Sequence, residues 1–354
     1  MTTEKTITPA GGKGAPPGWI GKILQGTHDH YTCLLPDNIS RFTRLLLRLF
    51  YSGIKVDKSQ TETIRQLDKN AIVVYVTKFK SHFEYLLYYS RYRREGLPYP
   101  QIGFDYKVYQ CQPFSRLLRI LLARLDFFIR HRSWPDPYER GYFKSELVNG
   151  RSGFLSLVGQ KGFYRRFVRA QTDPVQFLVE TQKSVDRPIY LVPQLIFFSK
   201  TARREIPTLI DVLFGPENKP GTLRRLFTLF KNPGKVFAEV SKPVNLQSYL
   251  QSDALRHQST EYQSLVLRRD LLVQLNRHRQ SITGPIRKAK EELKESILTG
   301  DRLQEFMNNY AASRNIPIHE VRRKADGYLE EIAANYKPAF IKIAAIIVGW
   351  TPKR

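Results

Sequence analysis

A group of polar side chains with chemical potential follows a short apolar run near the start of the chain. The run AIVVYV occupies residues 71–76, and Lys78, Lys80, Ser81, His82 and Glu84 come directly after it. A β-branched run of this length is typical of a buried strand, and open α/β folds bind their ligands at the carboxyl ends of such strands. A histidine two residues from a carboxylate at a strand-to-helix turn could act as a general base.

The same residues also permit a purely structural interpretation. Glu84 could form a capping or intrahelical pair at the start of the next helix, and His82 could belong to the polar surface. Residue types alone favour this interpretation over catalysis. These residues by themselves do not indicate a reaction.

The charge balance indicates an anionic partner. The 354 residues include 57 Lys and Arg against 32 Asp and Glu, a net charge of +25, while 42% of the residues are hydrophobic. This apolar content excludes a disordered basic tail, and the charge suits nucleic acid, acidic lipid headgroups or phosphorylated small molecules. Cys33 and Cys111 are too few for a disulfide framework or a cysteine-ligated zinc site, and fit a reducing compartment.

Arginine clusters beside leucine and aromatic residues favour lipid over nucleic acid. They occur at residues 165–169, 203–204, 224–225, 268–269 and 322–324. Such clusters suit either base stacking or a membrane interface. The sequence contains no RNA-recognition signature, zinc finger, heptad zipper or RGG repeat, so nucleic acid is the less favoured partner.

Two apolar runs separated by helical patterns predict a mostly parallel α/β sheet. The second run, residues 187–198, is separated from the first by helical patterns at 83–94 and 114–131 and by a helix that opens at Asp173 and Pro174. From about residue 249 the strand signal stops. Long charged helical patterns then follow, at residues 265–280, 286–298, 302–312 and 319–336.

Residues 39–49 predict a basic amphipathic helix. Its apolar residues recur at helical spacing on one face, and Arg41, Arg44 and Arg48 occupy the other. The helix either covers a core or docks on a membrane surface. Because no window reaches the roughly 18 apolar residues that a spanning helix needs, any membrane contact is expected to be peripheral.

Several segments resemble membrane-associated glycerol-3-phosphate acyltransferases. VYVTKFKSHFEYLL, residues 74–87, is similar to that family's first block, V-Y-V-P-C-H-[RK]-S-H-x-D-Y-L-L. Residues 127–131 (FFIRH) resemble the second block, F-F-I-R-R, and residues 187–198 resemble the fourth, R-P-I-x-L-V-P. The third block falls near residues 155–162, where Gly159 and Lys161 match, and residues 234–250 resemble a later segment. The resemblance covers roughly residues 40–350.

The resemblance implies a fold, a reaction and a location. The fold is a mostly parallel α/β sheet flanked by helices, glycerophospholipid acyltransferase-like, with an all-helical C-terminal extension. We expect a flexible segment at residues 1–38, the acyltransferase-like domain at 39–250 and the helical extension at 251–354. The reaction is acyl transfer from acyl-CoA or acyl carrier protein to a glycerol-3-phosphate or lysophosphatidate hydroxyl, without metal or organic cofactor. The location is cytoplasmic, peripheral on the inner membrane face.

The chain departs from the family at its reacting groups. The first-block histidine, which is the family's general base, is replaced by Phe79, and the aspartate that orients it corresponds to Glu84. Phenylalanine cannot accept a proton, and loss of such a base costs several orders of magnitude in rate. In the third block the acidic position is Val158 and the arginine position is Lys161, a ligand that cannot bind phosphate bidentately.

Two hypotheses follow for the function. In the first, the chain is a divergent enzyme in which Glu84 or His82 is catalytic. In the second, it is a catalytically inactive module that binds membrane or phosphorylated ligands, or that supports an active partner unit, such as a second, complete acyltransferase unit in longer relatives. Under either hypothesis the candidate phosphate-binding residues are those at or near the block positions, namely Lys80, Arg130, Lys161 and Arg187.

Overall fold

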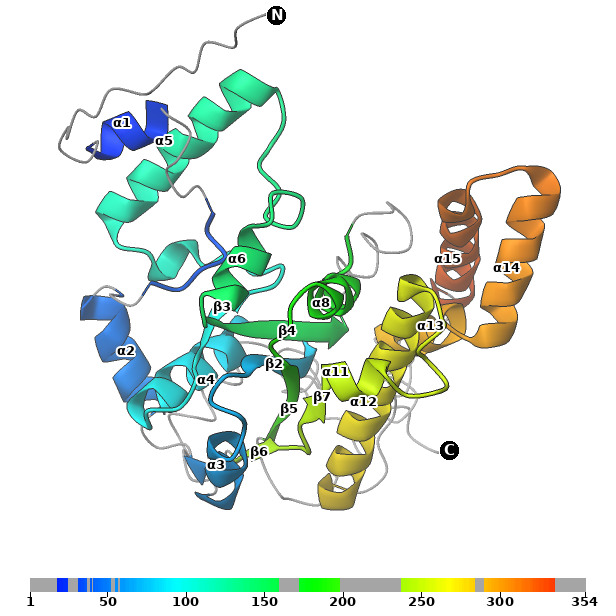
Figure 1. Ribbon diagram of the computed structural model, residues 1–354, viewed down its shortest axis with the longest axis horizontal. Coiled ribbons are helices and arrows are strands. Elements are labelled where there is room, and N and C mark those ends of the chain that lie inside the picture. Colours follow the sequence, from blue (N-terminus) through cyan, green and yellow to red (C-terminus); the bar gives the residue numbers. More distant parts are fainter. Residues whose placement is uncertain are drawn as a thin grey trace, which may run out of the picture.

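A mixed sheet with helices on both faces forms the centre of the computed structural model (Figure 1). The structure describes residues 18–24, 31–36, 39, 41–51, 55–56, 58–158, 172–197, 237–283 and 290–334. The strands of this part of the chain are β1 Lys55–Val56, β2 Ile72–Phe79, β3 Pro100–Gly103, β4 Ser152–Val158, β5 Ile189–Phe197, β6 Phe237–Val240 and β7 Val244–Asn245.

The sheet is mostly parallel, as the sequence predicts. Its strand order is β1-β6-β5-β2-β4-β3, with β7 paired to β5 outside this path. The central strand β2 pairs in parallel with both β4 and β5, and β3 extends the parallel region beyond β4. The antiparallel pairs join β5 to β6 and β7. The carboxyl ends of β2, β4 and β5 therefore lie along one edge of the sheet.

Helices precede, connect and follow the strands. The first half of the described chain contains α1 Trp19–Leu24, α2 Arg41–Tyr51, α3 Lys58–Arg65, α4 His82–Arg94, the 3-10 turn η1 Tyr109–Cys111, α5 Phe114–His131 and α6 Tyr142–Val148. The second half contains α8 Pro174–Lys183, α11 Leu246–Leu250, α12 Thr260–Thr283, α13 Lys290–Leu298, α14 Asp301–Arg314 and α15 Ile318–Ala334.

The alternation of side chains along β2 separates two apolar cores. Ile72, Val74 and Val76 face one core, which also takes in leucines of α8 and α12. Val73 and Tyr75 face the other core, which contains the buried tyrosines of α4. Both faces of β2 are thus covered, which explains why this strand is a nearly unbroken apolar run.

The strands and helices expected from the two apolar runs are confirmed with small shifts. The run at 71–76 becomes β2, which continues to Phe79, and the run at 187–198 becomes β5. Asp173 caps α8 by accepting a hydrogen bond from the backbone N–H of Gln176. The strands β3 and β4 were not predicted, because β3 is four residues long and contains proline and glycine, and β4 begins with the small residues Ser152 and Gly153.

The C-terminal region is helical, as expected, and its first helix packs on the sheet. Helix α12 contacts both α8 and β5, and Leu267, Leu271 and Leu275 belong to the same core as β5. Helix α13 also contacts β4 of the sheet, and α14 lies beside α15 (Figure 1). The division of the chain at residue 250 remains a prediction.

No helix among the described residues combines the length and the apolar character needed to cross a membrane. The apolar run at 340–350 lies outside the described residues, as do residues 1–17 of the expected N-terminal segment. The arginine clusters at residues 165–169, 203–204 and 224–225 lie outside them as well.

Candidate functional site

The carboxyl end of β2 carries a phenylalanine at the position where the expected site needs a base. Phe79 is the last residue of the strand, and the parallel register places it beside Val158 at the end of β4. Val158 is buried, and Phe79 is half-buried against the same core. Two apolar side chains therefore stand side by side at the edge where open α/β sheets bind ligands.

Ser81 caps the N-terminus of helix α4 and binds the backbone of Glu84. The Ser81 hydroxyl oxygen accepts a hydrogen bond from the backbone N–H of Glu84, at 3.3 Å. The backbone N–H of Ser81 itself donates to the Tyr106 hydroxyl, at 3.2 Å. Glu84 is half-buried in the first turn of α4, where its charge complements the helix dipole. The structural interpretation of Glu84 thus has a physical basis in the helix cap.

We expect Ser81→Ala to lower the free energy of unfolding by about 1 kcal/mol, because it removes the cap of α4. Ser90→Ala is the matched control: Ser90 lies in the middle of the same helix, and alanine there changes stability by less than about 0.5 kcal/mol. Urea unfolding followed by circular dichroism measures both. Equal effects for the two variants would show that the Ser81 cap contributes nothing.

His82 is the first residue of α4 and is open to solvent on one side. Its other side packs edge-on against the Tyr106 ring, with 5.2 Å between ring centroids. Desolvation of that side lowers the pKa of His82, and the nearby charge of Lys80 lowers it further, while a hydrogen bond with the Lys107 backbone opposes both. The lowered pKa favours the neutral form of the imidazole. The group that binds this ring is a backbone carbonyl rather than the carboxylate that orients a typical catalytic histidine.

Lys80 is held at the same edge by the loop after β3. Its ammonium group donates to the carbonyl oxygen of Asp105 and lies 4.9 Å from the centroid of the Tyr106 ring. Of the predicted site residues, Lys80 and His82 both lie against the Tyr106 ring, and Glu84 lies in the same first turn of α4 as His82. Tyr106 was not among the predicted residues, and only the tertiary structure brings it next to α4.

Helix α12 reaches the end of β2 through Lys78. This lysine is buried, donates to the side-chain oxygen of Asn276 at 2.7 Å, and lies 5.2 Å from the centroid of the Phe79 ring. The Lys78 side chain therefore links the end of β2 to α12 and lies against the Phe79 ring. Asn276 is a contact that the sequence did not reveal, since it lies 198 positions from Lys78.

A second contact ties α12 to the end of β4. Arg268 is buried, donates to the carbonyl oxygen of Leu157, and forms an ion pair with Asp173 at 2.6 Å. Glu295 lies 3.7 Å from the same guanidinium group. Arg268 therefore lies in the interior of the fold, although it belongs to the basic cluster at residues 268–269. A sequence signal did exist: Arg268 shares helical spacing with Leu271 and Leu275 on the buried face of α12.

The other predicted phosphate ligands lie elsewhere. Arg130 is on α5, where it pairs with Asp126 at 2.9 Å. Arg187 donates to the carbonyl oxygens of Asn70 at 2.7 Å and Val148 at 2.8 Å. Because Asn70 precedes β2 and Arg187 precedes β5, this arginine lies at the amino edge of the sheet, opposite Lys80. Lys161 lies outside the described residues, so its expected role stays a prediction.

A groove lined by arginines, which the sequence did not predict, lies between two helices of the first half of the chain. It has a volume of about 610 Å³ and lies between α2 and the end of α4. Arg44 and Arg48 line it from α2, and Arg91, Arg93 and Arg94 line it from α4. Arg91 pairs with Glu95 at 2.5 Å, and Arg93 donates to the Tyr89 hydroxyl at 2.8 Å. No carboxylate belongs to the described lining, so the groove suits anionic groups.

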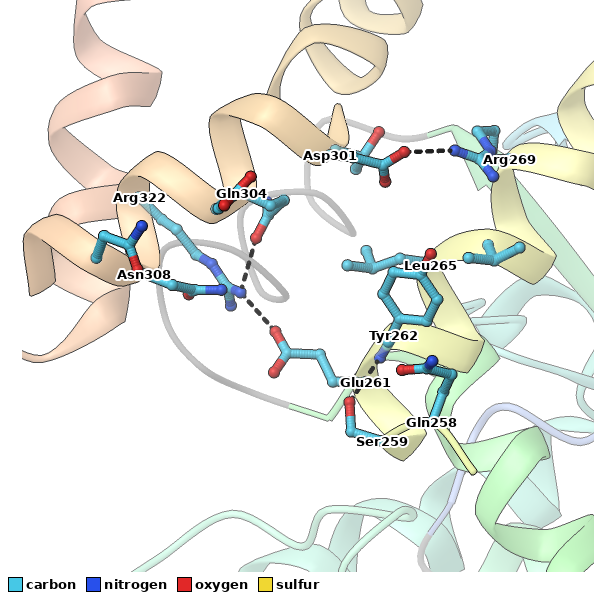
Figure 2. Close-up of a pocket in the computed structure, with 14 residues that line it drawn as sticks. Gln258, Ser259, Glu261, Tyr262, Leu265, Arg269, Asp301, Gln304, Asn308 and Arg322 are labelled. Carbon is cyan, nitrogen blue, oxygen red and sulfur yellow. Dashed lines mark hydrogen bonds and ion pairs between the residues drawn. The ribbon is translucent and has the colours of Figure 1, made fainter. Parts of the chain in front are cut away.

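A polar cavity of about 400 Å³ separates the start of α12 from α14 (Figure 2). Its arginines are already paired: Arg322 with Glu261 at 2.5 Å, and Arg269 with Asp301 at 3.3 Å. Arg322 is buried, although it belongs to the basic cluster at residues 322–324. Because carboxylates neutralise its cations, this cavity is poorly suited to a phosphate ligand.

The fold and the block positions define an α/β acyltransferase-like domain. The chain belongs to the family described as the glycerol-3-phosphate acyltransferase PlsB N-terminal domain, whose profile matches residues 39–284. It is 27% identical over 223 residues to a glycerol-3-phosphate acyltransferase of Shewanella putrefaciens (strain CN-32). The matched segment makes up 61% of this chain and 26% of the relative. The Shewanella denitrificans (strain OS217) protein of that name is 26% identical over 198 residues, covering 56% and 24%. The match thus spans about a quarter of the length of these curated relatives.

Proposed function

We propose that this chain is a non-catalytic acyltransferase-like unit of phospholipid synthesis, which works at an anionic membrane surface and supports an active acyltransferase unit. The observation that carries the proposal is Phe79 at the end of β2, with Val158 beside it in the register. Acyl transfer to a glycerophosphate hydroxyl needs a group that takes the hydroxyl proton. Neither side chain can do so.

The contacts around Phe79 support this proposal further. Lys78 is bonded to Asn276 of α12 and lies against the Phe79 ring. The Lys78 side chain is thus directed to α12 from the residue before the missing base, and it does not take the place of Phe79. Glu84 belongs to the first turn of a capped helix, and a backbone hydrogen bond holds His82.

The comparisons fit a supporting role. The matched family is described as an N-terminal domain, and the matched segments make up 24% to 26% of the Shewanella relatives. A longer relative of this kind has room for a separate catalytic unit. An H-x4-D-Y-L motif encoded beyond this segment, in the same or the neighbouring reading frame, would supply the base that Phe79 lacks.

The charge distribution supports the membrane as the place of action. The net charge is +25, and the groove between α2 and α4 is lined by five arginines. Anionic headgroups attract such surfaces with a strength that falls as the salt concentration rises. On this proposal the unit is peripheral at the inner membrane face.

One observation favours a second candidate, an active enzyme that transfers acyl groups from acyl-CoA or acyl carrier protein to glycerol 3-phosphate. The lowered pKa of His82 favours its neutral form, and the residue stands beside Lys80, which could bind a phosphate. A neutral, solvent-accessible imidazole can accept a proton. In this candidate His82 is the base and Glu84 assists it.

An acyl-transfer assay separates the two candidates. The chain is incubated with labelled glycerol 3-phosphate and either acyl-CoA or acyl carrier protein, with the full-length Shewanella putrefaciens relative assayed in parallel. We expect no labelled product above background from the wild type or from Phe79→His. The variant still has Val158 at the acidic position of the family's third block. Wild-type turnover that His82→Ala or Glu84→Ala abolishes would overturn the non-catalytic proposal. Turnover that survives both substitutions would overturn it as well.

A further inference from the structure

Helix α5 exposes an apolar stripe on the surface of the molecule. Six of its large apolar side chains are at least 40% exposed, namely Phe114, Leu118, Leu121, Leu122, Leu125 and Ile129. At about 100° per residue these six positions fall within an arc of about 100° on the helix. The buried residues of the same helix, Ile120 and Ala123, lie outside this arc. We call these six residues the α5 stripe.

The position of α5 explains why the stripe stays uncovered within the described chain. The helix lies beside α1, away from the sheet and from the C-terminal helices (Figure 1). A surface helix of a globular protein normally turns its apolar side towards the core. Helix α5 does the reverse, and exposed apolar patches of this kind mark interaction sites.

Tryptophan and arginine pairs border the α5 stripe on both sides. The guanidinium carbon of Arg119 lies 5.4 Å from the centroid of the Trp19 ring, and that of Arg124 lies 5.4 Å from the centroid of the Trp134 ring. By helical spacing, Arg119 and Arg124 fall on opposite sides of the stripe. The two tryptophans are 39% and 59% exposed. Tryptophan is enriched at membrane–water boundaries, and arginine beside it can reach lipid phosphates.

The positive charge of α5 indicates which kind of partner binds this surface. Helix α5 carries four arginines and one aspartate, Asp126, a net charge of +3 with His131 neutral. Two copies of the chain that met through this face would bring two such helices together, and their like charges would repel. A nucleic acid would meet a row that is mostly aliphatic and offers bases little to stack on. An anionic lipid surface satisfies both the apolar stripe and the arginines.

We propose that α5, with Trp19 and Trp134 at its borders, is the surface by which this chain docks on anionic membranes. The helix lies parallel to the membrane plane, with the α5 stripe among the acyl chains and the arginines at the phosphates. This inference rests on the membrane part of the proposed function and names the surface involved. It makes no use of the site at the end of β2.

Vesicle binding tests the proposal with a matched pair of substitutions. The full chain is mixed with vesicles of phosphatidylcholine and phosphatidylglycerol at low salt, and the bound fraction is measured by flotation. Leu118→Glu/Leu125→Glu is expected to weaken binding at least about tenfold, because each glutamate places a charge in the apolar layer. Ile332→Glu is the control, since Ile332 is 70% exposed on α15, far along the chain from α5. It should bind as the wild type does.

Tryptophan emission provides an independent signal. In the wild type the emission should shift to shorter wavelength on adding vesicles, and brominated lipids should quench it; both changes should be lost in the double variant. Wild-type binding that the double substitution leaves intact would overturn the α5 surface while leaving membrane association standing. Absence of any wild-type binding would overturn both. A wild-type dimer in light scattering that the double variant converts to a monomer, without vesicle binding, would assign the face to a second copy and overturn the proposal.

Discussion

Arg268→Ala is expected to lower the free energy of unfolding by about 3–5 kcal/mol. The substitution leaves Asp173 and Glu295 buried without the cation that lies 2.6 Å and 3.7 Å from them. It also removes a donor to the carbonyl oxygen of Leu157 at the end of β4. Urea unfolding followed by circular dichroism measures the loss. Because the lost contacts join α12 to the sheet, the variant should also be cleaved faster by protease between β7 and α12.

The neighbouring arginine provides the control for this prediction. Arg269 pairs with Asp301 at 3.3 Å, and both side chains are about half exposed or more. Exposed ion pairs contribute about 0–1 kcal/mol, so Arg269→Ala should change stability little. Removing all three buried charges together, by Arg268→Met with Asp173→Asn and Glu295→Gln, should recover part of the loss. If the two single arginine variants unfold at the same urea concentration, Arg268 does not act as a buried link.

Leu191→Ala in β5 is expected to lower the free energy of unfolding by about 2–5 kcal/mol. Leu191 is fully buried in the core that β5 shares with α12, so its truncation removes apolar contacts and leaves a cavity. The measurement is again urea unfolding. The size of the effect within this range reports how far β5, β2 and α12 can close the cavity.

The same type of substitution on α5 is expected to change the stability very little. Leu125 is 52% exposed on the α5 stripe, and Leu125→Ala should change the free energy of unfolding by less than about 0.5 kcal/mol. A loss as large as that of Leu191→Ala would mean that the α5 stripe is packed against other parts of the folded chain. That result would contradict the exposure on which the membrane-docking inference depends.

The local elements could be predicted because their signals are local. The β-branched run of β2, the helical spacing of α5, and the proline after Asp173 at the start of α8 each involve fewer than twenty neighbouring residues. The strands β3 and β4 escaped prediction because short segments with glycine or proline become strands only through pairing with a neighbour. The packing of α12 on the sheet was not predicted either, because it joins segments that are far apart in the sequence.

The candidate site was predicted in part. Lys80, His82 and Glu84 follow one strand, so their proximity to one another follows from the sequence. Arg130 and Arg187 were expected at the same place because their segments resemble family blocks. Arg187 instead binds backbone carbonyls at the amino edge of the sheet, and Arg130 pairs with Asp126 on α5. A residue's distance along the chain says little about which edge of a sheet it reaches.

The family, the mostly parallel α/β fold and the replacement of the expected base by Phe79 can all be recognised from the order of the amino acids. Three features become visible only in the folded chain: Phe79 stands beside Val158, Arg268 is buried, and the α5 stripe faces outwards. The physical reason is that periodicity identifies the residues sharing a face of an element, whereas burial depends on what packs against that face. Both α5 and α12 carry leucines and arginines at helical spacing. The leucines of α12 lie against the sheet, whereas those of the α5 stripe are exposed.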